Sequence, residues 1–303
     1  MVFELTILGS SSATPAYQRN PAAQVLNIHE RLFLIDCGEA TQIQLTKFKV
    51  KFHRINHVFI SHLHGDHYLG LMGLLSTLHL TGRTNELFLY CHQELKEVID
   101  LELKISETQL RFPIRYHFFQ EEDETIFEDD AICIKTIQLN HRIPCKGFIF
   151  LEKSGLRNLL RDKIVEYSIP VSAIPDIKKG NDFVTESGEK IKNNLLTSEP
   201  RIPRSYAYCS DTKYSKNIIP KIAGMDLLYH EATFLHDLLA RAEETFHTTS
   251  LQAGQIAKEA KAVKLIIGHF SARYKDLNPL LEEARSVFSN AFLALEGEKY
   301  PVD

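Results

Sequence analysis

The sequence lacks any long hydrophobic run. Of its 303 residues, 44% are hydrophobic, yet no stretch approaches the roughly 20 consecutive apolar residues that span a bilayer. The first eight residues have no basic stretch followed by a long apolar one, so no signal peptide is expected. Length and apolar content fit one large domain or two small ones with a substantial core. We therefore expect a cytoplasmic protein that does not bind membranes.

Cysteine is also scarce. The five cysteines are widely spaced, and none belongs to a Cys-x-x-Cys pair. An odd number without such pairs argues against a disulfide framework and favours buried thiols in a reducing compartment. Zinc ligation by Cys145 or Cys209 stays open, because each lies close in the sequence to a candidate metal ligand.

An overall positive charge is missing as well. The formal net charge is −4, which argues against a uniformly basic surface, so any contact with nucleic acid must be local. Residues 40–65 contain no acid, and residues 153–204 contain ten Lys or Arg against seven Asp or Glu. Either stretch could equally be ordinary solvated surface. Residues 121–130 contain seven acids and should face away from any nucleic acid.

Short apolar runs alternate with helical patterns along most of the chain, with no repeat or low-complexity tract. The runs predict strands at 3–8, 23–28, 32–35, 58–60, 87–90, 132–139, 148–151, 206–209, 226–229, 263–267 and 291–295. Helices are expected at 40–48, 68–80, 94–103, 250–260 and 278–288. Residues 152–204, with four prolines and three glycines, lack sustained periodicity and predict an inserted arm with loose local structure.

The most informative motif is His62-Leu63-His64-Gly65-Asp66-His67, placed between an expected strand and an expected helix. Residues two apart at the end of a strand point to the same side, so His62 and His64 can bind one cation. After the turn at Gly65, Asp66 and His67 face elsewhere. Imidazole with carboxylate suits zinc best, with manganese or iron as lesser possibilities. The motif predicts two adjacent metal sites, which in paired centres are roughly 3.5–4 Å apart.

Four side chains cannot complete two coordination shells. His141, Asp211 and His269 each follow a later expected strand and supply the missing ligand types. Taken singly, a His or Asp after a strand is more often a cap or turn residue. Their recurrence at strand ends, together with the first motif, favours a metal centre.

With these residues the chain resembles the metallo-β-lactamase superfamily and, more narrowly, the short form of the ribonuclease Z family. The narrower resemblance depends on blocks that occur in the family's order, namely Pro15-Ala16-Tyr17-Gln18-Arg19-Asn20, Gly38-Glu39-Ala40-Thr41-Gln42, His230-Glu231-Ala232-Thr233, His247-Thr248-Thr249 and His269-Phe270-Ser271-Ala272-Arg273-Tyr274. It implies one α/β (α+β) domain over residues 1–303, a four-layer αββα sandwich with residues 152–204 as an inserted flexible arm.

The resemblance also implies two zinc ions per chain. His62, His64 and His141 would hold one ion, Asp66, His67 and His269 would hold the other, and Asp211 would bridge them. Metal binding lowers the pKa of water to about 7, and Asp66 would orient the resulting hydroxide or take its proton.

His247 would protonate the leaving 3′-oxygen, with Glu231 as the candidate that holds its imidazole. A zincin protease reading of His230-Glu231 fails, because position 234 is Phe and not His. The residues implied at the substrate are Arg19, Asn20, Thr248, Thr249 and Arg273.

The inserted arm of this family grips transfer RNA and serves the partner subunit, which implies a homodimer. Its expected RNA contacts here are Arg157, Arg161, Lys163, Lys178 and Lys179. The family's arm often contains a Gly-Pro element, and the matching region of this chain, Ile169 to Pro175, keeps the prolines without that glycine.

The leading hypothesis is therefore a zinc-dependent endoribonuclease that removes the 3′ trailer of precursor transfer RNA. It would cut after the discriminator base and leave a 3′-hydroxyl on the transfer RNA and a 5′-phosphate on the trailer. The alternative is a binuclear zinc phosphodiesterase or other hydrolase of the same superfamily that acts on a small substrate. A third reading, a metal-stabilised RNA-binding module without catalysis, conflicts with the complete set of ligands.

Overall fold

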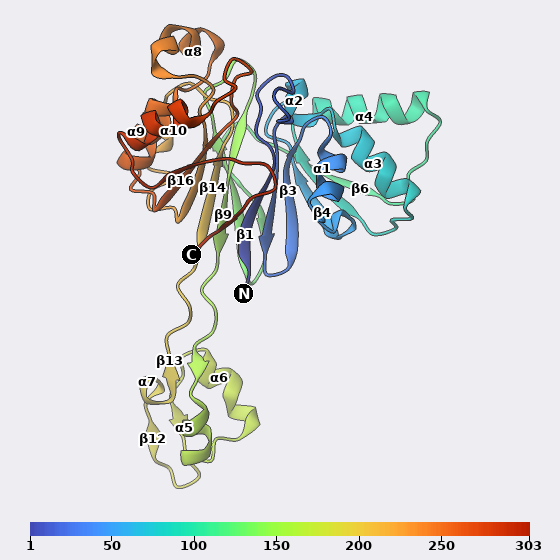
Figure 1. Cartoon of the computed structure of the whole chain (residues 1–303). Coiled ribbons are helices and arrows are strands. Elements are labelled where there is room, and N and C mark those ends of the chain that lie inside the picture. The colour runs from blue at the N-terminus through green and yellow to red at the C-terminus, as the bar shows by residue number, and fades with distance from the viewer. The chain divides into compact units, whose positions relative to one another are not determined.

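The computed structural model describes residues 1–303 and is shown in Figure 1. The chain forms two compact units. We call residues 1–127, 134–150 and 204–303 the core unit, and residues 128–133 and 151–203 the inserted unit.

The core unit contains a first seven-stranded sheet in the order β18-β1-β2-β3-β4-β5-β6. Pairings among β1, β2, β3 and β18 are antiparallel, whereas those from β3 through β6 are parallel. Parallel neighbours need crossover connections, and helices supply them here. The strands are β1 (Phe3–Gly9), β2 (Ala23–Ile28), β3 (Arg31–Cys37), β4 (Ile55–Phe59), β5 (Leu87–Cys91), β6 (Ile114–Phe118) and β18 (Lys299–Pro301).

Helices α1 (Thr41–Lys47), α3 (Leu71–Leu80) and α4 (Glu94–Ile105) lie beside this sheet (Figure 1). Leu71, Leu74, Leu75 and Leu78 of α3 are buried. Their spacing places them on one helical stripe, which packs into the hydrophobic core shared with the sheet. These helices form one outer layer of the fold.

A second seven-stranded sheet has the order β17-β16-β15-β14-β9-β8-β7, and its strands from β14 to β17 pair in parallel. Helices α9 and α10 cover its outer face (Figure 1). The elements are β7 (Thr125–Glu128), β8 (Ile132–Gln138), β9 (Lys146–Glu152), β14 (Ser205–Cys209), β15 (Leu227–Glu231), β16 (Lys264–Gly268), β17 (Ala291–Leu293), α8 (Leu239–Thr245), α9 (Ser250–Glu259) and α10 (Asn278–Arg285). Short 3-10 turns occur at η1 (Phe52–Arg54), η3 (Lys216–Ile218) and η4 (His236–Leu238).

The two sheets pack face to face through buried aromatic rings. Phe59 lies against Phe148 and Phe150, with ring centroids 5.5 and 5.6 Å apart. Tyr208 on the second sheet donates from its hydroxyl to Asp36 on the first, at 2.6 Å. Apolar contact and hydrogen bonds thus join the sheets, and with the outer helices they make the four-layer α/β sandwich expected from the sequence.

The inserted unit is more ordered than the sequence indicated. It contains β10 (Asn158–Leu159), α5 (Arg161–Glu166), η2 (Val171–Ala173), α6 (Ile174–Lys178), β11 (Phe183–Val184), β12 (Lys190–Ile191), α7 (Asn193–Leu196) and β13 (Thr197–Ser198). Its own small core consists of Ile169, Ile177, Phe183, Ile191 and Leu196. The expectation of loose local structure was wrong, because elements this short do not reveal a hydrophobic period.

Another difference lies beside the first motif, where the helix expected at 68–80 is two helices, α2 (Gly65–Tyr68) and α3. Leu69 and Gly70 separate the two helices, and a Cβ atom on Gly70 would lie 2.0 Å from the carbonyl oxygen of Gly38. A Cβ on Gly38 would in turn lie 2.3 Å from the carbonyl oxygen of Asp66. The two glycines therefore let α2 approach the loop after β3.

Strands β6, β7 and β18 and helix α8 were not predicted from the sequence. Every helix is too short or too polar to cross a membrane.

Candidate metal centre

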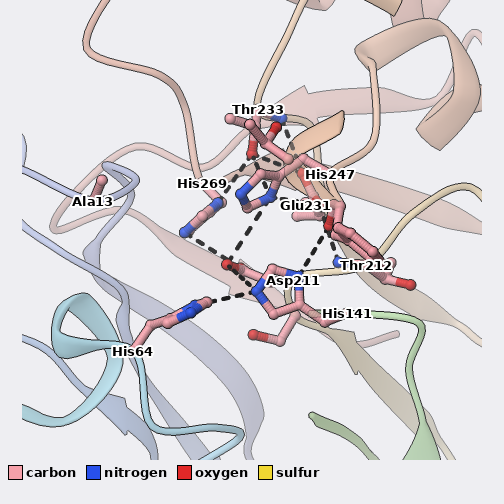
Figure 2. A network of polar contacts seen from close by, with 12 residues as sticks. Ala13, His64, His141, Asp211, Thr212, Glu231, Thr233, His247 and His269 are labelled. Atoms are coloured by element: carbon pink, nitrogen blue, oxygen red, sulfur yellow. Dashed lines mark hydrogen bonds and ion pairs between the residues drawn. The ribbon is translucent and has the colours of Figure 1, made fainter. Parts of the chain in front are cut away.

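The seven candidate ligands gather at one edge of the core unit. His62, His64, Asp66 and His67 lie on the loop after β4 and on α2, so they come from the first sheet. His141, Asp211 and His269 follow β8, β14 and β16 of the second sheet. His269 adopts a left-handed backbone with φ of 60°. The strand ends of both sheets meet here, which brings together residues more than 200 positions apart (Figure 2).

The first group contains His62, His64, His141 and Asp211, whose ligand atoms all lie within 4.8 Å of one another. His64 Nδ1 is 3.1 Å from both His62 Nε2 and His141 Nε2. Asp211 Oδ2 is 3.6 Å from His62 Nε2 and 3.8 Å from His141 Nε2. Four ligand atoms bound tetrahedrally to zinc would be about 3.3 Å apart. The group therefore has the spacing of a single-cation site.

The second group contains Asp66, His67 and His269. His269 Nε2 is 3.2 Å from His67 Nε2 and 3.3 Å from Asp66 Oδ2. Asp211 Oδ1 lies 3.4 Å from His67 Nε2 and 3.3 Å from His269 Nε2. Asp211 thus presents one carboxylate oxygen to each group, which is the geometry of a ligand that bridges two cations.

Hydrogen bonds fix the far ring nitrogen of four of these five histidines. His67 Nδ1 lies 2.8 Å from Asp36 Oδ2, and His62 Nδ1 lies 3.0 Å from Ser61 Oγ. His269 Nδ1 lies 3.0 Å from Thr233 Oγ1, and His141 Nδ1 lies 3.0 Å from the carbonyl oxygen of Phe246. Such partners hold a metal-binding imidazole in one tautomer and orientation.

Burial and nearby charges both shift the pKa values of these candidate ligands, often in opposite directions. Burial lowers the pKa of His62 well below its usual value. Burial also acts to lower the pKa of His67, but the carboxylates of Asp211, Asp66 and Asp36 outweigh it and raise that pKa. The pKa of Asp66 is lowered, because nearby His67 and His269 outweigh the effect of burial. The carboxylates are therefore ionised, as metal ligation requires.

His247 lies beside the second group, on the opposite side of Asp211 from His64 (Figure 2). Its Nδ1 is 3.0 Å from Glu231 Oε1 and 3.9 Å from Asp211 Oδ2. Burial acts to lower the pKa of His247, but Glu231 and Asp211 outweigh it and raise that pKa to about 9. The fully buried Glu231 also accepts hydrogen bonds from the backbone N–H groups of Thr212 and Thr248. Its position is therefore fixed by the strand-end loops around it.

A cavity of about 490 Å³ opens over the two groups. Asp66, Asp211, His247 and His269 line it, and so do three arginines, Arg142, Arg241 and Arg273. A cavity lined by three arginines suits an anionic substrate that reaches the ligands from outside.

The other residues expected at the substrate lie in different surroundings. Arg273 lines the cavity. Arg19 Nη2 donates to the carbonyl oxygen of Tyr274, and both the backbone N–H and the side-chain amide of Asn20 donate to Glu296. Thr248 and Thr249 are buried: Thr248 Oγ1 donates to the carbonyl oxygen of Thr212, and Thr249 caps helix α9.

The five basic residues expected to bind RNA all lie in the inserted unit. Arg157, Lys163 and Lys179 form ion pairs with Glu199, Glu166 and Asp176. Arg161 is exposed and Lys178 is half-buried. Surface ion pairs of this kind contribute little to stability.

Sequence reasoning missed several polar residues of the centre. Asp36 is fully buried and accepts from the backbone N–H of Ser61, from Tyr208 and from His67. Thr233 supports His269, and the backbone N–H of Ala13 donates to Asp66 Oδ2 at 2.7 Å. Thr233 lies in the His230-Glu231-Ala232-Thr233 block and Asp36 two residues before Gly38, which was the available signal.

The cysteines are not among the grouped ligand atoms. Cys145 Sγ lies 3.6 Å from His62 Nδ1, the ring nitrogen that points away from the first group. Burial raises the pKa of the Cys145 thiol well above its usual value and that of Cys209 to about 12. The groups of ligand atoms that lie close enough to hold a cation contain histidines and carboxylates and no cysteine sulfur.

Comparison with known proteins agrees with this geometry. A family model described as "Anti-Pycsar protein Apyc1" matches residues 3–157, a range that contains the first motif and His141 but ends before Asp211, His247 and His269. Among solved structures, the metallo-β-lactamase fold protein YhfI from Bacillus subtilis has a TM-score of 0.70 at 20% identity, with 99% of this chain and 100% of that chain covered. Fold and site thus define a protein with the metallo-β-lactamase fold and a cluster of His and Asp side chains that fits metal ions.

Relatives that match over nearly the full length define the family. Ribonuclease Z of Phocaeicola vulgatus is 48% identical over 302 residues, which are 99% of this chain and 98% of that protein. Ribonuclease Z of Cytophaga hutchinsonii is 48% identical over 307 residues, 100% and 97% of the two chains. The human short-form tRNase Z structure has a TM-score of 0.72 at 25% identity and covers 99% of each chain. The chain belongs to the ribonuclease Z family, and it is an endoribonuclease.

Proposed function

We propose that this protein is a two-zinc endoribonuclease that removes the 3′ trailer of precursor transfer RNA by cutting after the discriminator base. The observation that carries the two-metal assignment is Asp211, whose two oxygens each face a separate group of histidines. The full-length similarity to ribonuclease Z proteins supports the choice of substrate.

Zinc is proposed because imidazole and carboxylate donors at near-tetrahedral spacing suit it. His62, His64 and His141 would hold one ion, Asp66, His67 and His269 the other, and Asp211 both. Bound there, the pair would supply an activated water nucleophile near neutral pH.

The chain's own residues handle the protons. Asp66 Oδ2 faces His269 and accepts the backbone N–H of Ala13, so this carboxylate is held in place to orient the attacking water or take its proton. His247, protonated because of Glu231 and Asp211, donates its proton to the leaving 3′-oxygen of the transfer RNA. Glu231 keeps His247 protonated and holds its ring in the orientation needed to donate that proton.

Substrate contacts follow from position. Arg273 lies at the cavity and would bind a phosphate near the cut. Arg19 and Asn20 donate hydrogen bonds to Tyr274 and Glu296, so they would shape the mouth of the cavity. Thr248 and Thr249 would hold the loop that carries His247. The inserted unit would bind the body of the transfer RNA through Arg157, Arg161, Lys163, Lys178 and Lys179.

We further propose that the protein forms a homodimer and works in the cytoplasm. The supporting surface is an apolar hollow of about 370 Å³ between α2, α3 and α4. Leu69, Leu101 and Ile105 are 60%, 57% and 71% exposed there, and exposed apolar patches commonly mark interfaces. Leu101→Glu should shift the protein to monomers in sedimentation measurements, and an unchanged dimer would place the interface elsewhere.

The test of the function is to incubate the zinc-loaded protein with a precursor transfer RNA that carries a 3′ trailer, and to map the cut and its end groups. One cut after the discriminator, with a 3′-hydroxyl and sensitivity to chelator, is expected. No cut, together with rapid hydrolysis of small phosphodiesters, would instead indicate a small-substrate hydrolase.

A further inference from the structure

His64 differs from the other histidines of the centre. Its Nδ1 faces the first group, at 3.1 Å from two other ring nitrogens. Its far nitrogen, Nε2, has no protein acceptor and instead lies 3.4 Å from Nη2 of Arg142. Arg142 is exposed at the rim of the cavity, and no carboxylate pairs with it.

When His64 binds a cation through Nδ1, this contact becomes a pair of donors. A neutral imidazole that binds a cation through Nδ1 carries its proton on Nε2, so Nε2 donates. A guanidinium is always protonated and also only donates. Two donors 3.4 Å apart do not bond to each other. Both can instead bond to one acceptor oxygen that lies on the cavity side of the pair.

The oxygen that fits is not one held by the cations. The two nitrogens of an imidazole point to opposite sides of the ring, so an acceptor at His64 Nε2 lies outside the first group. An anionic oxygen is favoured because one donor carries a full charge and the guanidinium fork matches phosphate geometry. A phosphate next to the scissile one in the RNA chain would supply such an oxygen.

We propose that Arg142 and His64 Nε2 form a subsite for the second phosphate of the trailer, the one between its first and second nucleotides. The assignment to the trailer follows from Figure 2, where His64 and His247 lie on opposite sides of Asp211. His247 serves the departing transfer-RNA end, so RNA on the far side is the trailer. The inference rests on the proposed function, because it takes the phosphate from precursor RNA.

Trailer length tests the subsite. A one-nucleotide trailer has the scissile phosphate but no second phosphate, whereas a three-nucleotide trailer has both. Arg142→Ala should lower kcat/KM about tenfold for the longer trailer, near the contribution of one partly exposed charge-assisted hydrogen bond, and leave the one-nucleotide precursor unaffected. Arg142→Lys should restore part of the loss, since it keeps the charge without the fork.

Arg241→Ala is the matched control. Arg241 also lines the cavity, but it pairs with Glu244 and does not touch His64. Any effect of its loss should be the same for both trailer lengths.

Binding supplies a readout separate from turnover. The probe is a precursor whose leaving 3′-oxygen is replaced by a methylene group, so that it is not cleaved. Arg142→Ala should weaken its binding about tenfold and reduce the slope of log Kd against log salt by about 0.7, the value for one single-strand phosphate contact. A neutral methylphosphonate at the second trailer phosphate should produce the same loss in the wild type and no further loss in Arg142→Ala.

Three results would overturn the subsite: equal losses for one- and three-nucleotide trailers, additive effects of methylphosphonate and Arg142→Ala, or zinc loss from Arg142→Ala. The last would mean that Arg142 supports His64 instead of the RNA. If the wild type failed to cut any precursor, the proposed function would fail first, and the two failures are thus distinguishable.

Discussion

Replacing His247 with alanine separates its role from that of the metal ligands. If His247 donates the proton to the leaving 3′-oxygen, His247→Ala should lower kcat by about 10²- to 10⁴-fold at pH 7, the usual contribution of a general acid. Zinc content should stay at the wild-type value, because the seven proposed ligands remain. The measurements are single-turnover cleavage of a precursor transfer RNA and metal analysis of the same sample.

The structure also gives the direction of the pH dependence. Glu231 at 3.0 Å and Asp211 at 3.9 Å, acting against burial, raise the pKa of His247 to about 9. A group with this pKa is about 99% protonated at pH 7, so the acid is ready in the resting protein. Cleavage that needs the proton falls as pH rises through the pKa. Bound cations repel the proton, so the fall occurs at or below about pH 9.

Two outcomes would refute this reasoning. Loss of zinc from His247→Ala would move His247 into the ligand shell, a possibility raised by its grouping with Asp211 and His269. An unchanged rate would mean that another group protonates the leaving oxygen. His53→Ala is the control, since His53 is exposed and lies outside the cavity.

Three further predictions follow from the same geometry. Asp211→Ala should cost both metals, as metal analysis would show, and retention of two ions per chain would contradict the bridge. Glu231→Gln should destabilise the fold by about 2–4 kcal/mol in thermal denaturation. The reason is that the amide NH2 of Gln would face backbone N–H groups that now donate to the Glu231 carboxylate. The control is the exposed Glu259→Gln, which breaks a surface pair with Lys216 and should cost under about 1 kcal/mol. Deletion of residues 155–200 should abolish precursor cleavage yet spare a small chromogenic phosphodiester, and loss of both activities would show that the inserted unit supports the core.

The sequence predicted the layers and the clustering of the candidate ligands because both follow from local signals. The spacing of His62, His64, Asp66 and His67 is local, and His141, Asp211 and His269 each mark the end of an apolar strand. The structure brings these seven side chains together as the pattern indicated. Which metal these side chains bind, and the role of each side chain, stay predictions.

Other features depend on partners that are distant in the sequence. Asn20, which is expected at the substrate, donates its hydrogen bonds to Glu296, 276 positions away. Asp36 reaches His67 across 31 positions, and no local pattern distinguishes it from a turn residue. The order of the inserted unit escaped notice because its core is assembled from single apolar residues on very short elements.

The two halves of the ligand set belong to different sheets, and this division has a consequence for folding. Cations held there would cross-link the two sheets at one edge, in addition to the aromatic contacts between them. Binding energy gained only in the folded chain adds to its stability by mass action. Metal supply would then set the lifetime of the protein as well as its activity, and under zinc shortage the enzyme would become more prone to unfolding and proteolysis.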